Sequence, residues 1–179
     1  IIIVHGFASS PEMYWFPWLR EELEKEGYLV SAPQMPSPLL PRMKEWVPFL
    51  ARFVGSVDEN TFFVGHSIGC QAIIRYLEAL PGEVKAGGAI FVAPFIILPE
   101  IERASVAPGI DIAIDFTKVK KHLSKSTAIF SDDDPFVSIS NKELLERLLG
   151  SKTIVVNNHS HFTTIKEFPL LVSVLRDIV

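Results

Sequence analysis

Six short runs of apolar, mostly β-branched residues recur along the chain, separated by segments with helical spacing. They lie at residues 1–5, 28–32, 61–65, 88–93, 127–131 and 153–157. These runs are almost continuously apolar, which is typical of parallel strands covered on both faces. Several segments between them carry apolar residues three and four positions apart, as in amphipathic helices. This alternation predicts a three-layer α/β fold, with about six mostly parallel strands and helices on both faces.

The whole chain is expected to form a single domain, residues 1–179. Its 179 residues are 48% hydrophobic, enough for one sizeable core, and no repeat or linker divides them. Residues 94–117 fit the alternation least well, because Pro99, Pro108 and Gly109 interrupt them. We expect an irregular flap there, beside the functional site.

Composition excludes several classes of function. The net charge is −4 and the basic residues are scattered, so nucleic acid is not an expected partner. No apolar run approaches the roughly 20 residues of a membrane span, and the short run at residues 1–4 is predicted to be a strand, not a signal peptide. Cys70 is the single cysteine, so no internal disulfide forms, and we expect a cytoplasmic location. No cofactor is indicated.

The sequence Gly65-His66-Ser67-Ile68-Gly69 matches the nucleophile-elbow pattern G-x-S-x-G. It lies between the apolar run at 61–64 and an amphipathic segment, the strand–turn–helix context that this motif requires. The glycines permit a tight, strained turn that exposes the serine hydroxyl above the carboxyl end of the sheet. Ser67 is therefore the candidate nucleophile. The alternative is a glycine-rich turn in which the serine only caps a helix.

A serine nucleophile needs a base, and in this fold an acid and then a histidine follow it along the chain. Three acids, Asp132, Asp133 and Asp134, follow the run at 127–131. We choose Asp134, because an Asp directly before a proline starts a turn, and keep Asp133 as second choice. No His or Glu cluster accompanies these acids, so we expect no metal site.

The base is expected in the loop after the last predicted strand. Both His159 and His161 lie there, and spacing alone does not separate them. His5, His66 and His122 are poor candidates. In particular, His66 is expected to point away from the elbow.

Two backbone N–H groups are expected to form an oxyanion hole. One belongs to Ile68, the residue after the nucleophile. The other is assigned to Phe7, in the loop after the first predicted strand, where Gly6 lets the loop turn inward.

These motifs resemble the small serine hydrolases related to retinoblastoma-binding protein 9. The stretches that carry the resemblance are IVHGF at 3–7, WFPWL at 15–19, GHSIGC at 65–70, SDDDPFV at 131–137 and HF at 161–162. The resemblance implies a compact α/β-hydrolase fold without a large cap domain, and a triad of Ser67, Asp134 and His161. The family usually has Gly-His-Phe where this chain has Ser160-His161-Phe162. The resemblance also implies esterase-like or aminopeptidase-like activity.

The combined interpretation is a carboxylesterase-like serine hydrolase that acts on a small ester or amide, such as a short peptide, through an acyl-enzyme intermediate. An apolar substrate pocket is expected from four aromatic residues: Trp15, Phe16, Phe136 and Phe162. Two alternatives stay open: a partner-binding protein with little activity on the same fold, and an aminopeptidase-like hydrolase. No motif identifies a protein partner.

Overall fold

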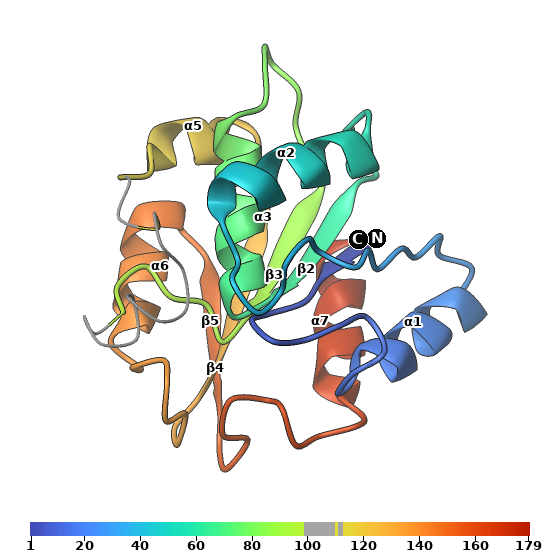
Figure 1. Ribbon diagram of the computed structural model, residues 1–179, viewed down its shortest axis with the longest axis vertical. Coiled ribbons are helices and arrows are strands. Elements are labelled where there is room, and N and C mark those ends of the chain that lie inside the picture. The colour runs from blue at the N-terminus through green and yellow to red at the C-terminus, as the bar shows by residue number, and fades with distance from the viewer. Residues whose placement is uncertain (99–109, 111–112) are drawn as a thin grey trace.

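A parallel five-stranded sheet forms the middle layer of the protein (Figure 1). The structure is a computed structural model that describes residues 1–98, 110 and 113–179. The strands lie in the spatial order β1-β2-β3-β4-β5, and every neighbouring pair is parallel. Their bounds are β1 Ile2–Val4, β2 Phe62–His66, β3 Gly88–Val92, β4 Ser126–Ser131 and β5 Lys152–Val156.

The strand expected at residues 28–32 is reduced to a single bridge between Ile2 and Ser31. Two backbone hydrogen bonds hold it, from Ile3 N to Ser31 O (2.8 Å) and from Ser31 N to Ile1 O (2.9 Å). On one side of the bridge only the Ile1 amino group donates further, to the Leu29 carbonyl at 2.7 Å, and on the other Pro33 has no N–H to extend the ladder. The described residues therefore contain five strands where we expected about six.

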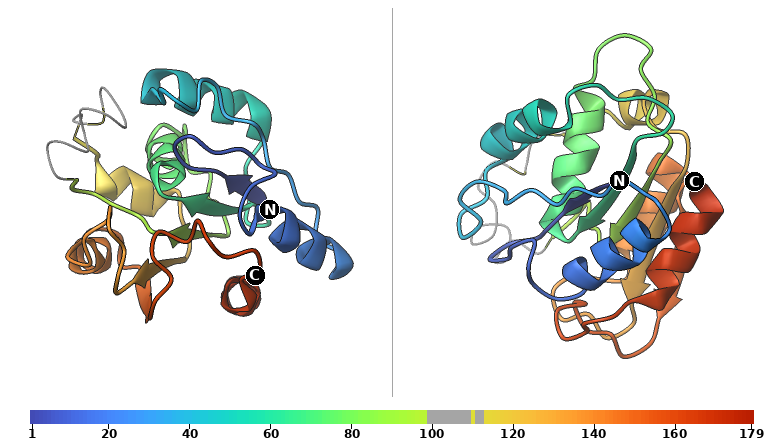
Figure 2. Two further views of the ribbon diagram at one scale, coloured as in Figure 1. Left: turned by 60° about the horizontal axis from the view of Figure 1, so that its bottom comes forward. Right: turned by 90° about the vertical axis from the view of Figure 1, so that its right-hand side faces the viewer.

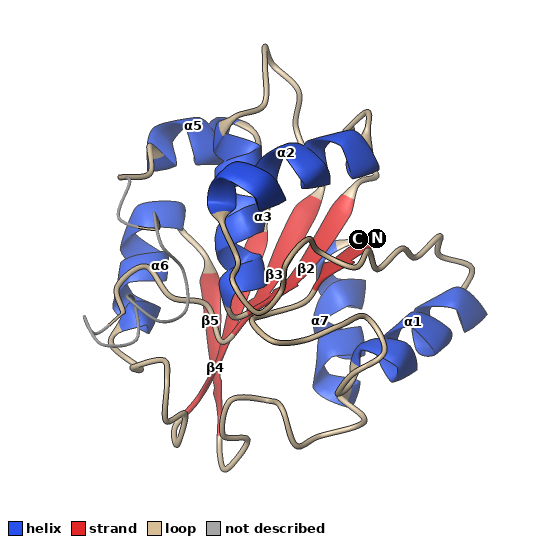
Figure 3. Cartoon of the chain, in the orientation of Figure 1, coloured by secondary structure: helices blue, strands red, loops and turns tan. Residues whose placement is uncertain are grey.

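Helices cover both faces of the sheet, which confirms the three-layer prediction (Figures 2 and 3). On one face lie α2 (Met43–Val54), α3 (Ile68–Glu78), α5 (Phe116–Lys121) and α6 (Asn141–Leu149), and on the other α1 (Phe16–Lys25) and α7 (Pro169–Ile178). Side chains of β2 alternate between the two cores: Phe63 packs with α2 and α3, whereas Phe62 and Val64 pack with α1 and α7. This alternation follows from the two-residue period of a strand.

The carboxyl ends of the strands are where this topology gathers loops from distant parts of the chain. The turn after β2 and the loops after β1, β4 and β5 all begin at that edge (Figure 1). The flap expected at 94–117 falls mostly on residues 99–109 and 111–112, which lie outside the described residues. Among the helices that the structure describes, none has the length and apolar character to cross a membrane.

Candidate active site

Ser67 occupies the sharp turn between β2 and α3. Its backbone is left-handed, with φ 53° and ψ −122°, a conformation that costs a non-glycine residue energy. The turn is fixed by the Ser67 amide, which donates to the Val92 carbonyl of β3 at 2.9 Å, and by the Cys70 amide, which donates to the Ser67 carbonyl at 2.9 Å. The residue is 7% exposed. A strained serine at this position is the geometry of a nucleophile elbow.

The two flanking glycines of the motif are required by close backbone approach. A Cβ atom on Gly69 would lie 2.3 Å from the Val4 carbonyl oxygen and 2.6 Å from that of His5. One on Gly65 would lie 3.0 Å from the Cys70 backbone. Gly69 therefore lets the start of α3 pack directly against the backbone at the end of β1. Steric restrictions thus explain why the motif has glycine at both flanking positions.

The loop after β1 lies against the elbow. The buried His5 ring holds it: Nδ1 donates to the Gly6 carbonyl at 2.9 Å, and Nε2 accepts the Met35 amide at 3.0 Å. Burial lowers the pKa of His5, so the ring is neutral, as these bonds require. Within the described part of the chain, neither the Phe7 amide nor the Ile68 amide has a hydrogen-bond acceptor. Both N–H groups expected to form the oxyanion hole are thus available to donate to a bound substrate.

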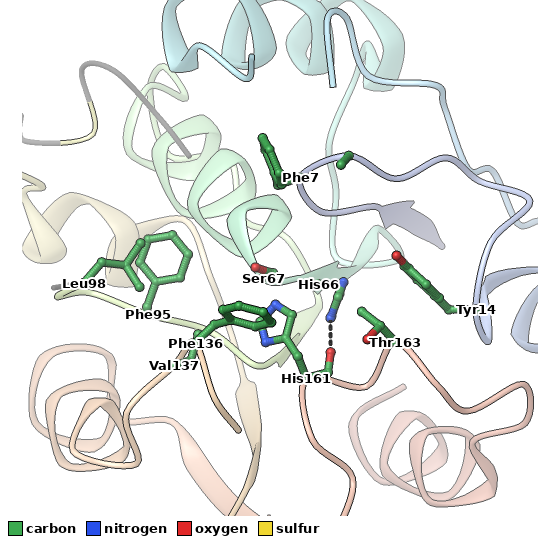
Figure 4. A pocket seen from close by; sticks show the side chains of 11 residues that line it. Phe7, Tyr14, His66, Ser67, Phe95, Leu98, Phe136, Val137, His161 and Thr163 are labelled. Atoms are coloured by element: carbon green, nitrogen blue, oxygen red, sulfur yellow. Dashed lines mark hydrogen bonds between the residues drawn. The ribbon is translucent and has the colours of Figure 1, made fainter. Parts of the chain in front are cut away.

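The structure pairs His161 with Asp134. His161 Nδ1 lies 2.8 Å from Asp134 Oδ2, and the side chains are only 11% and 3% exposed. The other carboxylate oxygen, Oδ1, accepts the amides of Phe136 (2.9 Å) and Val137 (3.0 Å), which orients the carboxylate. His161 and Ser67 line the same cavity, although no hydrogen bond joins their side chains in the described structure (Figure 4).

The alternative acid and base lie elsewhere. Asp133 accepts the Ser131 hydroxyl at 2.6 Å and the Ser160 amide at 2.8 Å. His159 Nδ1 lies 2.8 Å from the Asn157 carbonyl oxygen, and its ring packs near Phe162. Of the candidates left open by spacing, only Asp134 and His161 contact each other beside Ser67.

His66 does not point away from the site, as we had expected, but lines the cavity (Figure 4). Its Nε2–H donates to the His161 carbonyl oxygen at 2.9 Å, and its ring centroid lies 5.0 Å from that of His161. Burial, and secondarily the charge of His161, lowers the pKa of His66 from 6.5 to about 3. The ring is therefore neutral and supports the backbone of His161.

A cavity of about 350 Å³ opens beside Ser67 (Figure 4). Its lining is mostly apolar, and the residues that form it are Phe7, Ala8, Tyr14, His66, Ser67, Phe95, Leu98, Phe136, Val137, His161 and Thr163. Within the described ranges, no group of three His, Cys, Asp or Glu side chains is arranged to hold a metal ion.

Of the four aromatics expected to line this pocket, only Phe136 does so. The other three, Trp15, Phe16 and Phe162, are at most 1% exposed and lie in the core between the sheet and helices α1 and α7. Their rings pack there because burial of a large aromatic surface is favourable. The sequence analysis missed Tyr14, immediately before Trp15, whose left-handed φ of 55° is not encoded by any pattern.

Comparison with known proteins identifies the family. The family model described as "Serine hydrolase" matches residues 1–175. The chain belongs to the serine hydrolase family. It is 31% identical over 169 residues to YdeN of Bacillus subtilis (strain 168), covering 90% of this chain and 85% of that protein. It is also 28% identical over 166 residues to the serine hydrolase RBBP9 of Rattus norvegicus, covering 92% and 86%.

Solved structures agree with this membership. The crystal structure of the ydeN gene product from B. subtilis matches with a TM-score of 0.93 at 29% identity, covering 99% of this chain and 96% of that one. A more distant match, the carboxylesterase CesB from Bacillus subtilis, has a TM-score of 0.69 at 14% identity, with 99% and 82% covered, and shows the shared fold alone. The family and its compact α/β-hydrolase fold, predicted from sequence motifs, are confirmed.

Proposed function

We propose that this serine hydrolase cleaves small, uncharged esters with an apolar acyl group, through an acyl-enzyme intermediate on Ser67. The observation that carries the proposal is the contact between Asp134 and His161 beside a strained serine. A nucleophile next to a base that a third group orients is the general arrangement of a catalytic triad.

In the proposed reaction, His161 Nε2 removes the Ser67 hydroxyl proton as Oγ attacks the ester carbonyl carbon. The oxyanion accepts hydrogen bonds from the amides of Phe7 and Ile68. His161 then gives its proton to the leaving alkoxide as the ester C–O bond breaks. Water attacks the acyl-enzyme, His161 takes its proton, and the carboxylic acid leaves as the proton returns to Ser67 Oγ. Asp134 accepts the Nδ1–H bond throughout and stabilises the imidazolium.

The chemistry of the cavity supports an apolar acyl group over a peptide with a free amino terminus. Phe95, Leu98 and Val137 line it with apolar atoms, and Phe136, 55% exposed, lies at its rim. A free ammonium group forms its strongest hydrogen bonds with a carboxylate. The carboxylate beside the cavity, Asp134, already uses one oxygen for His161 and the other for two backbone amides.

The test combines covalent labelling with turnover. Wild-type protein should react with a fluorophosphonate probe and hydrolyse p-nitrophenyl butyrate, and Ser67→Ala should lose the label and about 10⁶-fold in kcat. Ser173→Ala, an exposed serine on α7, is the matched control and should keep both properties. Retained turnover in Ser67→Ala would refute the assignment. A wild-type protein with neither label nor turnover would instead support a partner-binding role.

A further inference from the structure

Two loops meet at the carboxyl end of the sheet, and each carries one member of the acid–base pair. The loop after β4 contains Asp134, and the loop after β5 contains His161. β4 and β5 pair in register up to Ser131 and Val156, so the two loops leave the sheet side by side. The separation of Asp134 and His161 therefore depends on what joins the loops beyond the last strand residues.

Three consecutive side chains, from the last residue of β4 and the first two of the loop that follows, bind three consecutive backbone amides of the second loop. Asp132 Oδ1 accepts the Asn158 amide at 2.9 Å, Ser131 Oγ accepts the His159 amide at 3.0 Å, and Asp133 Oδ1 accepts the Ser160 amide at 2.8 Å. We call these three bonds the loop clasp.

Ser131 and Asp133 also bind each other, which makes the loop clasp a connected network. The Ser131 hydroxyl donates to Asp133 Oδ1 at 2.6 Å, and this leaves its lone pairs free to accept the His159 amide. The Ser131 hydroxyl and the Ser160 amide lower the pKa of Asp133, so the carboxylate is ionised at neutral pH and its hydrogen bonds are charge-assisted.

The second loop needs such support because its backbone is strained. Asn158, Ser160 and Phe162 all have left-handed φ angles, of 59°, 48° and 58°. Each costs a non-glycine residue on the order of 1 kcal/mol and persists only where the surroundings impose it. The loop clasp binds the amides of two of these residues, Asn158 and Ser160.

We propose that Ser131 and Asp133 are positioning residues that set the place of His161 relative to Asp134 and Ser67. The inference rests on the proposed function. Asp133 immediately precedes the acid and Ser160 immediately precedes the base, so the bond between them acts one residue from each partner. Movement at Ser160 passes directly into the His161 backbone, which is anchored on its other side by His66.

The central variant is Asp133→Ala, which removes the acceptor for both the Ser160 amide and the Ser131 hydroxyl. A displacement of about 1 Å in a catalytic group costs up to about 10²-fold in rate. We expect kcat on p-nitrophenyl butyrate to fall by about 10- to 100-fold, with KM changed by less than about twofold. Asp133→Asn keeps the Oδ1 acceptor and should restore kcat to within about fivefold of wild type.

Asp58→Ala is the matched control. Asp58 Oδ1 also accepts one backbone amide, of Asn60, and one hydroxyl, of Thr61, both at 3.0 Å. It precedes β2 and so lies at the opposite end of the sheet from the site. Its variant should lower the melting temperature about as much as Asp133→Ala does, without changing kcat.

A second readout does not depend on turnover. The proton between His161 Nδ1 and Asp134 should give a low-field ¹H resonance in wild type, lost or shifted upfield in Asp133→Ala and Ser131→Ala, and kept in Asp58→Ala. The proposal is overturned if kcat and this resonance in Asp133→Ala match those of Asp58→Ala. It is also overturned if Asp133→Asn is as impaired as Asp133→Ala. Failure of the Ser67→Ala test would refute the proposed function, while the resonance would still test the loop clasp.

Discussion

Ser67 and Ser160 have almost the same left-handed φ angle, but different kinds of contact hold the two turns. Their φ angles are 53° and 48°. Ser67 is buried, and its amide donates to the Val92 carbonyl inside the sheet. Ser160 is half-buried, and its amide donates to the exposed carboxylate of Asp133. One strained turn is thus held by buried backbone and the other by an exposed side chain.

Substitutions are expected to affect these two parts of the site in different ways. Around Ser67, the position of Gly69 against β1 leaves no room for a methyl group, so the constraint is steric. Around Ser160, the constraint is a set of polar contacts that another acceptor can replace. We therefore expect substitutions in the elbow to destabilise the fold. Substitutions in the loops after β4 and β5 should instead displace Asp134 and His161 relative to Ser67.

Among substitutions in the loops after β4 and β5, the largest expected effect is at Asp134, where the negative charge matters as well as the hydrogen bond. Asp134→Asn should lower kcat by about 10⁴-fold, because an amide facing Nδ1 favours the wrong imidazole tautomer and no longer stabilises the imidazolium. That loss corresponds to about 5 kcal/mol of transition-state stabilisation. Steady-state hydrolysis of p-nitrophenyl butyrate is the measurement.

Asp132→Asn is the control for this prediction. Asp132 Oδ1 accepts only a backbone amide, which an asparagine oxygen also accepts, so kcat should fall by less than about tenfold. Equal losses in Asp132→Asn and Asp134→Asn would contradict the assignment of the acid.

The second prediction tests the steric character of the elbow. Gly69→Ala places a methyl group 2.3 Å from the Val4 carbonyl oxygen, and we expect it to lower the free energy of unfolding by more than about 3 kcal/mol. Gly27→Ala is the comparison, because Gly27 has φ +88° but no atom within 4 Å of the new Cβ, and it should cost only about 1 kcal/mol. Urea unfolding measures both. Similar losses in the two variants would contradict the steric role assigned to Gly69.

The third prediction concerns the buried imidazole that links the elbow to the histidine loop. The pKa of His66 is about 3 in the folded protein, against 6.5 unperturbed, mainly because of burial and then because of His161. Between these values the unfolded chain binds more protons than the folded one, so stability falls as pH falls. Linkage gives a loss of roughly 3 kcal/mol between pH 7 and about pH 4.

His66→Gln should lack this part of the pH dependence. The titratable groups that act on His66 are His161, Asp134 and His5, and all three remain in the variant. Urea unfolding of both proteins at about pH 4 and pH 7 compares the slopes, whatever the variant costs at neutral pH. An unchanged slope would mean that His66 is already protonated, or exposed, in the folded protein.

The same contrast explains which parts of the site were predictable from sequence. The elbow carries its own steric requirements within five residues, so Gly65, Ser67 and Gly69 were found from the pattern alone. Local turn chemistry narrowed the acid to Asp134, with Asp133 as second choice, and position in the loop after the last strand narrowed the base to His159 or His161. The structure distinguishes these candidates by two contacts, Asp134 with His161 and Asp133 with Ser160. Each joins residues 27 positions apart, so no local sequence pattern predicts it.

The pocket was predicted least well, for a related reason. Trp15 and Tyr14 are adjacent, yet one ring enters the core and the other lines the cavity, because of the left-handed turn at Tyr14. Phe95 and Leu98 lie after β3 in a segment without periodicity. The fold class followed from the alternation of strands and helices, whereas the apolar run at 28–32 did not reveal that only Ser31 forms a bridge to β1.

The smallest expected effect is a gain of stability from relaxing the strained turn at Ser160. Ser160→Gly should raise the free energy of unfolding by a few tenths to about 1 kcal/mol, because glycine adopts φ 48° without the Cβ penalty. Part of that gain is offset, since glycine is also freer in the unfolded chain. The bond from the residue 160 amide to Asp133 is kept, so kcat should stay within about twofold of wild type. Ser160→Ala, which removes the hydroxyl but keeps the strain, should change stability by less than about 0.5 kcal/mol. The urea unfolding midpoints of the wild type, Ser160→Gly and Ser160→Ala test this prediction. A destabilised Ser160→Gly would mean that the serine side chain, and not the loop clasp, holds this turn.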